Sequence, residues 1–357
     1  MAAANVILSD PRGRNLAILA AVALLLAIAA VLALNGQQAA VEPRYAQHEF
    51  FPNLARHARE IMRLRIQSKA HGAFDVVFKP EKGWVLPTRS DFRASFNQVQ
   101  HTVVGLAALE TFEPKTANPQ WYSYIGVQAP DRGGSGVRIT AYDEKGHVLA
   151  DLIAGKTVDI GDPNGSQGLF ARKPGEKQSW LLQSWFEPRS DIADWMDKDV
   201  LSIDRSRIRE IDVQPASGAS FTVRRDNPAQ SDFALVNVPK GREVSYPAAA
   251  DGVAAAISDF SFDDVQPAAK FNFSGAAHLI TRTFDGLDIT ADVINLNGAY
   301  WAQFAAEAAK PAAENEAREI NARTNGWAYK LPAYKGQQFM TTLDSLLKPL
   351  APAASKK

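Results

Sequence analysis

The 357-residue sequence contains no cysteine, which excludes disulfides, thiolate metal sites and cysteine nucleophiles. It also lacks a charge excess, because Lys plus Arg and Asp plus Glu each number 39. No long run of one sign stands out, so we expect neither the basic face of a nucleic-acid-binding protein nor polybasic adhesion to lipid.

Catalytic signatures are absent too. The sequence has no G-x-x-x-x-G-K-[ST], H-E-x-x-H or G-x-S-x-G pattern. The glycine-rich residues 133–136 have no strand-then-helix context for holding phosphate and are predicted to be a flexible loop. We therefore expect no enzymatic activity, no cofactor and no catalytic, cofactor-binding or metal residues. A hydrolase of unfamiliar layout remains a minor alternative.

The titratable residues that could form a site are scattered. No two histidines lie three or four residues apart, which favours solvated surface positions over a zinc site. Asp263 and Asp264 are adjacent, so their side chains diverge and a shared proton is not expected. Asp131 and Arg132 are predicted to be an ordinary loop pair. The histidines are His48, His57, His71, His101, His147 and His278.

Residues 15–34 form an uncharged apolar run without Gly or Pro, NLAILAAVALLLAIAAVLAL. About 20 apolar residues in a helix span a bilayer core of ~30 Å, so we predict a transmembrane helix at residues 15–35. Arg12 and Arg14 precede the run, which predicts a cytoplasmic tail at residues 1–14 and an extracytoplasmic body. A cleaved signal peptide is the alternative, although the run is long and no good cleavage site follows it.

The rest of the chain is predicted to be a globular α+β body behind a linker at residues 36–49. Residues 64–67, 74–78 and 84–86 are predicted strands, and residues 91–109 a helix with Asp91 as N-cap. A hairpin is expected at residues 137–153 and another at residues 168–182.

The pattern then restarts, which predicts a tandem duplication. Residues 211–214 (IDVQ) match 64–67 (LRIQ), residues 291–294 (ADVI) match 150–153 (ADLI), and residues 246–260 supply the equivalent helix. Trp327, matched to Trp84, is predicted to open a partial third restart, and residues 301–323 are predicted to be mostly helical. The predicted boundaries are 50–187 for the first repeat, 188–305 for the second, 306–350 for a C-terminal helical segment and 351–357 for a tail.

Aromatic residues gather near the predicted junction. Trp180, Trp185 and Trp195 either fill the seam between the halves or mark a binding surface, and the seam is favoured. Trp84 and Trp327 are expected in equivalent core positions.

Several segments in order resemble the DUF4340 family. They include residues 83–86 (GWVL), 113–119 (EPKTANP), 150–156 (ADLIAGK) and 326–335 (GWAYKLPAYK), together with Tyr122. The resemblance covers nearly everything after the apolar run. It implies association with a gliding-motility-type (Gld-like) ABC transport system, alongside an ATPase, a permease and an auxiliary membrane subunit, and it assigns no catalytic residue.

The expected function is therefore a single-pass inner-membrane accessory or scaffold with its body in the periplasm. The alternative is a module that binds an envelope polymer or lipid without a transporter, in a cleft between the repeats.

Overall fold

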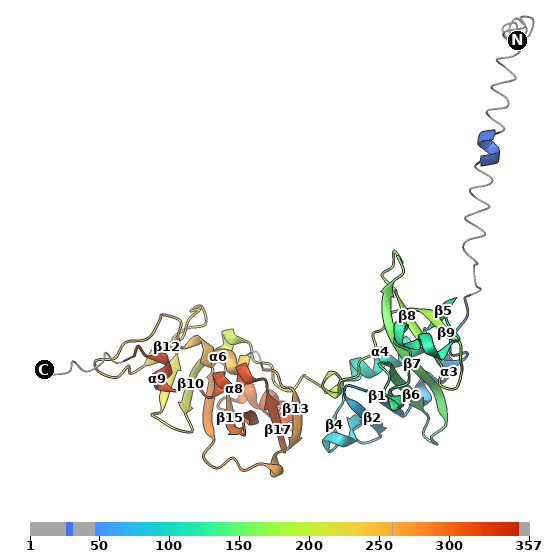
Figure 1. Cartoon of the computed structure of the whole chain (residues 1–357). Helices are drawn as coiled ribbons and strands as arrows, with labels where there is room; N and C mark the ends of the chain where they lie inside the picture. The colour runs from blue at the N-terminus through green and yellow to red at the C-terminus, as the bar shows by residue number, and fades with distance from the viewer. Residues whose placement is uncertain (1–25, 31–46, 259, 350–357) are drawn as a thin grey trace, which may run out of the picture.

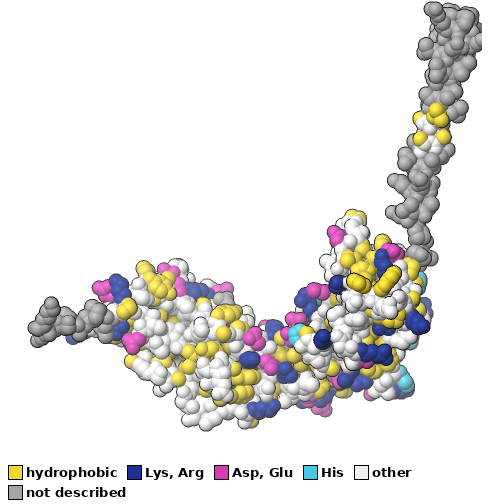
Figure 2. Space-filling model, viewed as in Figure 1, with side chains coloured by type: hydrophobic (Ala, Val, Ile, Leu, Met, Phe, Trp, Pro, Cys, Tyr) yellow, Lys and Arg dark blue, Asp and Glu magenta, His cyan; other side chains and the backbone are white. Residues whose placement is uncertain are grey.

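The computed structural model describes residues 26–30, 47–258 and 260–349. Two antiparallel sheets, one in each of two lobes, form the framework of this part of the chain, and a few helices pack against them (Figure 1). This confirms a β-rich α+β fold. On the face shown in Figure 2, acidic and basic side chains are interspersed over both lobes.

The first lobe contains a nine-stranded sheet with the order β4-β3-β2-β1-β6-β7-β8-β9-β5. Its strands β1 and β2 form because apolar and polar residues alternate, so that one face is buried and the other is exposed. In β1, for example, Leu64 and Ile66 are fully buried between partly exposed neighbours. Strands β6 to β8 have consecutive buried residues, because a second small apolar cluster covers part of their other face. The strands are β1 (Arg63–Ser68), β2 (Gly72–Lys79), β3 (Gly83–Leu86), β4 (Phe92–Arg93), β5 (Glu110–Pro114), β6 (Val137–Tyr142), β7 (Val148–Asp159), β8 (Gln167–Arg172) and β9 (Ser179–Ser184).

The second lobe contains an eight-stranded sheet with the order β12-β11-β10-β14-β15-β16-β17-β13. Apart from the two-residue β4, each strand of the first sheet has a counterpart at the same place in this order and in the same chain sequence. The strands are β10 (Ile208–Gln214), β11 (Phe221–Arg224), β12 (Ala234–Val236), β13 (Asp264–Pro267), β14 (Ala277–Thr283), β15 (Leu287–Leu296), β16 (Ala299–Ala308) and β17 (Trp327–Leu331).

Strand register agrees with the predicted correspondence in one place and differs in another. Leu64 pairs with Val76, and Ile211 pairs with Val223, as the match between residues 64–67 and 211–214 requires. The next strands differ. From Gln67 the pairing runs through β6 to Ile153 of β7, whereas from the matched Gln214 it runs through β14 to Asp292 of β15. The segments 150–153 and 291–294 are therefore offset by two residues, a shift that leaves every side chain on its predicted face.

Helices are fewer and shorter than the sequence patterns indicated. The α-helices are α3 (Leu54–His57), α4 (Phe96–Ala107), α5 (Tyr122–Ile125), α6 (Asp251–Ser258), α7 (Glu314–Thr324), α8 (Ala333–Phe339) and α9 (Leu343–Leu346). Single 3-10 turns include η2 (Pro87–Arg89), η3 (Pro119–Trp121), η4 (Pro130–Arg132), η5 (Ile192–Trp195) and η8 (Pro311–Ala313).

The prediction for the first long helix was wrong at its start. Ser95, not Asp91, caps α4, and its hydroxyl accepts a hydrogen bond from the Gln98 amide. Asp91 has a left-handed φ of 64° and its carboxylate accepts two 2.7 Å hydrogen bonds from Lys79, which hold the pKa of Asp91 below its usual value. Phe96 is 63% exposed, so the apolar stripe begins at Val99.

The predictions for the C-terminal part also need correction. Trp327 opens β17, which lies between β16 and β13 and completes the second sheet, so no third restart is formed there. Residues 301–308, predicted as helix, belong to β16, because they pair with β15 along their whole length. Asn321 on α7 ties that helix to β16 by hydrogen bonds in both directions with the backbone of Ala306.

Residues 185–203, which leave the first sheet after β9, fold back over it beside α4. Trp195 is fully buried, packs edge-on against Phe74 and donates its indole N–H to the Arg189 carbonyl. Phe186 lies directly over Gly105 of α4, where a Cβ would come within 2.7 Å of the Phe186 Cβ. Glycine at position 105 therefore permits the close approach of this segment to the helix.

Most of the predicted transmembrane run lies outside the described residues. Residues 26–30, from its middle, are helical, and Leu26 and Ile28 are 66% and 48% exposed. In the portion of the chain that the structure covers, no helix has both the length and the apolar character needed to cross a bilayer.

We predict that Gly105→Ala lowers the melting temperature. The added methyl group overlaps Phe186 and forces a shift costing about 1–3 kcal/mol, more than the roughly 1 kcal/mol that alanine contributes to a helix. Gly252→Ala in α6 is the matched control, since nothing lies within 4 Å of its Cβ, and its melting temperature should be unchanged or higher. Equal behaviour of the two variants in thermal unfolding would contradict this account.

Candidate functional site

An aromatic cluster joins the two lobes. Phe92 on β4 is 1% exposed, and its ring meets the rings of Phe262, Trp327 and Tyr329 edge-on at centroid distances of 6.1, 5.0 and 6.3 Å. In Figure 1, β13 and β17 lie at the side of the second lobe that faces the first. The buried apolar residues of the two lobes form one continuous cluster, so the rings fix the lobes together.

Ionic contacts surround this cluster. Arg89 donates two hydrogen bonds to the Asp264 carboxylate, from Nε to Oδ1 at 2.5 Å and from Nη2 to Oδ2 at 3.2 Å. Lys198 donates to the Phe262 carbonyl at 2.7 Å and sits 4.1 Å from the centre of its ring. Burial lowers the pKa of Lys198, against the opposing effect of Asp263. Asp264, the first residue of β13, thus bridges the lobes.

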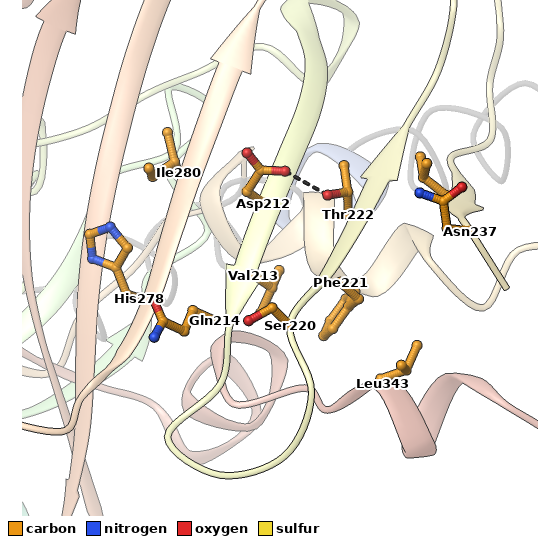
Figure 3. A pocket seen from close by; sticks show the side chains of 11 residues that line it. Asp212, Val213, Gln214, Ser220, Phe221, Thr222, Asn237, His278, Ile280 and Leu343 are labelled. Atoms are coloured by element: carbon orange, nitrogen blue, oxygen red, sulfur yellow. Dashed lines mark hydrogen bonds between the residues drawn. The ribbon is translucent and has the colours of Figure 1, made fainter. Parts of the chain in front are cut away.

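A pocket of about 360 Å³ opens on the second sheet (Figure 3). Neighbouring strands supply its walls, with Asp212 from β10, Thr222 from β11 and His278 from β14, while Leu343 of α9 closes one side. These side chains meet because β10 is flanked by β11 and β14: Asp212 pairs directly with Thr222, and His278 pairs with Gln214, two residues further along β10. Sequence reasoning missed this set, although alternation on adjacent strands was the signal for it.

The charged groups of this pocket are already paired. Asp212 accepts hydrogen bonds from the Thr222 hydroxyl at 2.6 Å and from Arg282 at 2.5 Å. Partial burial acts to raise the pKa of Asp212, but these two hydrogen bonds outweigh it and lower that pKa below its usual value. His278 Nδ1 lies 2.7 Å from Asp292, which also accepts from Gln303. The pocket therefore offers hydrogen bonds without a large unbalanced charge.

One possible catalytic arrangement is incomplete. His278 and Asp292 form a base with an orienting carboxylate, and Ser220 lines the same pocket. Within the described residues no hydrogen bond joins Ser220 to His278, and Figure 3 shows Gln214 near the line between them. The nucleophile–base contact of a hydrolase is thus not formed in this arrangement.

The other histidines lie apart from one another. His57 contacts Glu60, His71 lies near Asp191 and His147 contacts Asp143. His48 contacts Thr111 at the start of the first lobe, and His101 lies on α4. Across the described ranges, no group of three or more His, Asp or Glu side chains could hold a metal ion.

The tryptophans separate into different environments. Trp195 is core, Trp180 is half-buried beside His48, and Trp185 is 62% exposed. Trp84 of β3 packs edge-on against Phe78 of β2, whereas Trp327 packs edge-on against Phe92 at the lobe junction. The two therefore do not occupy equivalent positions, contrary to expectation.

Trp185 borders a groove of about 390 Å³ between α4 and the segment that follows β9. Its walls include His101 and Val104 of α4, and Val104 is 57% exposed. Glu187 and Arg189 stand at the rim and are joined by a 2.9 Å ion pair. An exposed aromatic ring beside exposed aliphatic carbon, with charges at the edge, is the usual make-up of a protein-binding surface.

A comparison with known proteins gives one finding. The model of a domain of unknown function, DUF4340, matches residues 84–275. The match begins in β3 and ends just before β14, so it includes strands of both sheets. No curated protein and no solved structure matches the chain.

We predict that Phe92→Ala destabilises the protein by about 3–5 kcal/mol, because it removes a buried ring that contacts three others. Phe96→Ala removes the same ring from a 63% exposed position and should change the free energy of unfolding by roughly 0.5 kcal/mol or less. Denaturant unfolding measures both, and similar losses in the two variants would show that the junction does not hold the lobes together.

Proposed function

The chain belongs to the DUF4340 family, a domain of unknown function, and from that premise we propose that it is a membrane-anchored extracytoplasmic accessory subunit, or scaffold, of an ABC-type transport system. It would act without catalysis, by binding. The observation that carries the proposal is the order of the chain, an apolar run of 20 residues behind two arginines followed by a large folded body.

The anchor would place the body next to its partners. A helix at residues 15–35 confines the two lobes to a shell near the membrane surface. Two-dimensional confinement raises the effective concentration of the body toward membrane-embedded subunits, so that weak contacts suffice for association. The helical, exposed residues 26–30 are consistent with this arrangement.

We further propose that the body arose by tandem duplication. The support is the shared strand order of the two sheets and the position of α4 and α6 at corresponding points of the chain. In addition, Leu64 pairs with Val76 in the first sheet as the matched Ile211 pairs with Val223 in the second. A duplicated body whose halves are fixed by Phe92 presents two related surfaces at a constant angle, which suits a scaffold that contacts more than one subunit.

The groove beside α4 is the surface we assign to the permease or auxiliary subunit. Trp185 and Val104 are exposed there although both are apolar, and burying such side chains against a partner contributes about 25 cal/mol per Å² of apolar area. Gly105 and Phe186 set the floor of the groove, so its shape is fixed by packing before any partner arrives.

A first test concerns topology. Protease added to intact spheroplasts should digest residues 36–357 and spare the short N-terminal tail. A tag at the N-terminus should stay on the full-length chain in the membrane fraction, whereas a cleaved signal peptide would remove it. Complete protection of the body from protease would contradict the proposed orientation.

A second test concerns partners. Affinity purification from gently solubilised membranes should recover an ATPase and a permease with the wild-type protein. Trp185→Ala should reduce that recovery several-fold, because it removes the largest exposed ring of the groove. Trp121→Ala is the matched control, since Trp121 is 59% exposed and does not line the groove, and it should leave the recovery unchanged.

The alternative function is that of an envelope polymer- or lipid-binding module independent of a transporter. The predicted binding cleft between the repeats is not formed at Phe92, where aromatic rings fill the junction. The feature that favours this alternative is instead the polar pocket at Asp212 and Thr222 in the second lobe. Recovery of the protein alone in the purification, together with binding to envelope fractions that Asp212→Ala weakens, would favour this alternative over the transport role.

A further inference from the structure

A pocket of about 550 Å³ lies in the first lobe. Tyr122 of α5, Asp131 and Arg132 of η4, and Arg172 at the end of β8 are among its walls. It brings together segments that the sequence places far apart, and it belongs neither to the groove beside α4 nor to the second-sheet pocket.

Arg172 is the unusual residue of this pocket. It is 8% exposed, and its guanidinium hydrogen-bonds only neutral backbone carbonyls, those of Lys173, Val127 and Glu176. Its Nε is buried without any acceptor, and no carboxylate pairs with it among the described residues. A buried cation without a counter-charge is costly, because burial removes its hydration while the carbonyls supply no negative charge.

Two other arginines of the two lobes have their guanidinium groups hydrogen-bonded more completely. Arg138, also on the pocket wall, is held by Asp151 with bonds of 2.9 and 2.7 Å, which raise its pKa. Arg225 of the second lobe is 4% exposed, but each of its three guanidinium nitrogens donates to a backbone carbonyl. Arg93, Arg242 and Arg323 each have a buried guanidinium nitrogen without an acceptor, but each of them is paired with an aspartate. Among these arginines of the described residues, only Arg172 lacks both an acceptor for one buried nitrogen and a carboxylate partner.

The ring of Tyr122 fixes the guanidinium in place. Arg172 lies over this ring at 4.7 Å from its centre, and the Tyr122 hydroxyl donates to the Lys177 carbonyl at 2.5 Å. Tyr122 is itself buried, at 7% exposure. The cation is thus held in one orientation by the protein before any ligand binds.

Glycines shape the surrounding wall. A Cβ at Gly136 would lie 2.6 Å from the Gln128 carbonyl oxygen and 2.7 Å from Ile153, and one at Gly155 would overlap the Ile125 carbonyl. Residues 133–136, predicted to be a flexible loop, therefore include glycines that allow tight packing of this wall. Such a wall favours a ligand site that is formed in advance.

We propose that this pocket binds an oxyanion, a phosphate or carboxylate group carried by a small molecule, with Arg172 as its central cation. Arg132 and Lys177 stand exposed at the rim and add positive charge. Asp131 and Glu176 also line the pocket and oppose an anion, but the cations Arg132, Arg172 and Lys177 outnumber them even when Arg138, which Asp151 pairs, is left out. The bound anion supplies the counter-charge that Arg172 lacks. This assignment does not depend on the proposed transport role.

The test uses the full chain in detergent, with inorganic phosphate, glycerol phosphate and succinate as probes at constant ionic strength. Titration calorimetry should give saturable binding of at least one probe, and the melting temperature should rise with its concentration. Tighter binding of glycerol phosphate than of phosphate identifies a phosphate ester such as a lipid headgroup, and tighter binding of succinate identifies a carboxylate. Absence of saturable binding by all three overturns the proposal.

Variants locate the site. Arg172→Met should weaken binding at least about tenfold, and Arg225→Met, a buried arginine of the second lobe, should leave it unchanged. If Arg172→Met does not fold, the double variant Arg132→Gln with Lys177→Gln, at exposed positions, should weaken binding roughly threefold to tenfold. Lys145→Gln, an exposed residue outside the pocket, should have no effect. Equal binding by wild type and the pocket variants overturns the proposal.

Discussion

The structure depends on the burial of Phe92 against three aromatic rings of the other lobe. Each sheet buries one face under its own helices and connecting segments, but β4 is two residues long and contributes little pairing energy of its own. Its role is to position the Phe92 ring against the second lobe, where Arg89 and Asp264 add a directional contact beside it. Aromatic packing supplies the affinity between the lobes and the paired hydrogen bonds fix the angle.

Strands such as β1 and β2 could be predicted from sequence because apolar and polar residues alternate along them and turn residues separate them. Leu64, Ile66, Phe74 and Val76 are buried on one face as their spacing required. The helix starts could not be predicted, because Asp91 is as good an N-cap as Ser95 until the contact with Lys79 is known. Residues 301–308 have a composition compatible with helix, and it is pairing with β15, a contact distant in sequence, that makes them a strand.

The candidate sites were harder to predict than the fold, since their residues come together only through tertiary contacts. Asp212, Thr222 and His278 are unremarkable outward-facing residues until the order of β11, β10 and β14 is known. Arg172 ends a strand and would be taken for a solvated cation. The nearby glycines at 134, 136 and 155 were the available signal, but glycine needed for close packing and glycine in a mobile turn look the same in a sequence.

The ends of the two sheets carry one more consequence. Unpaired sheet margins invite further strands from other chains, and here each margin is blunted. β4 and β13 are two and four residues long, and β13 ends in Pro267. β12 has three residues, while β5 pairs at Glu110 with Glu49 from the segment before α3. A body built around two sheets is thereby protected from edge-to-edge growth into fibrils, even where many copies are crowded together.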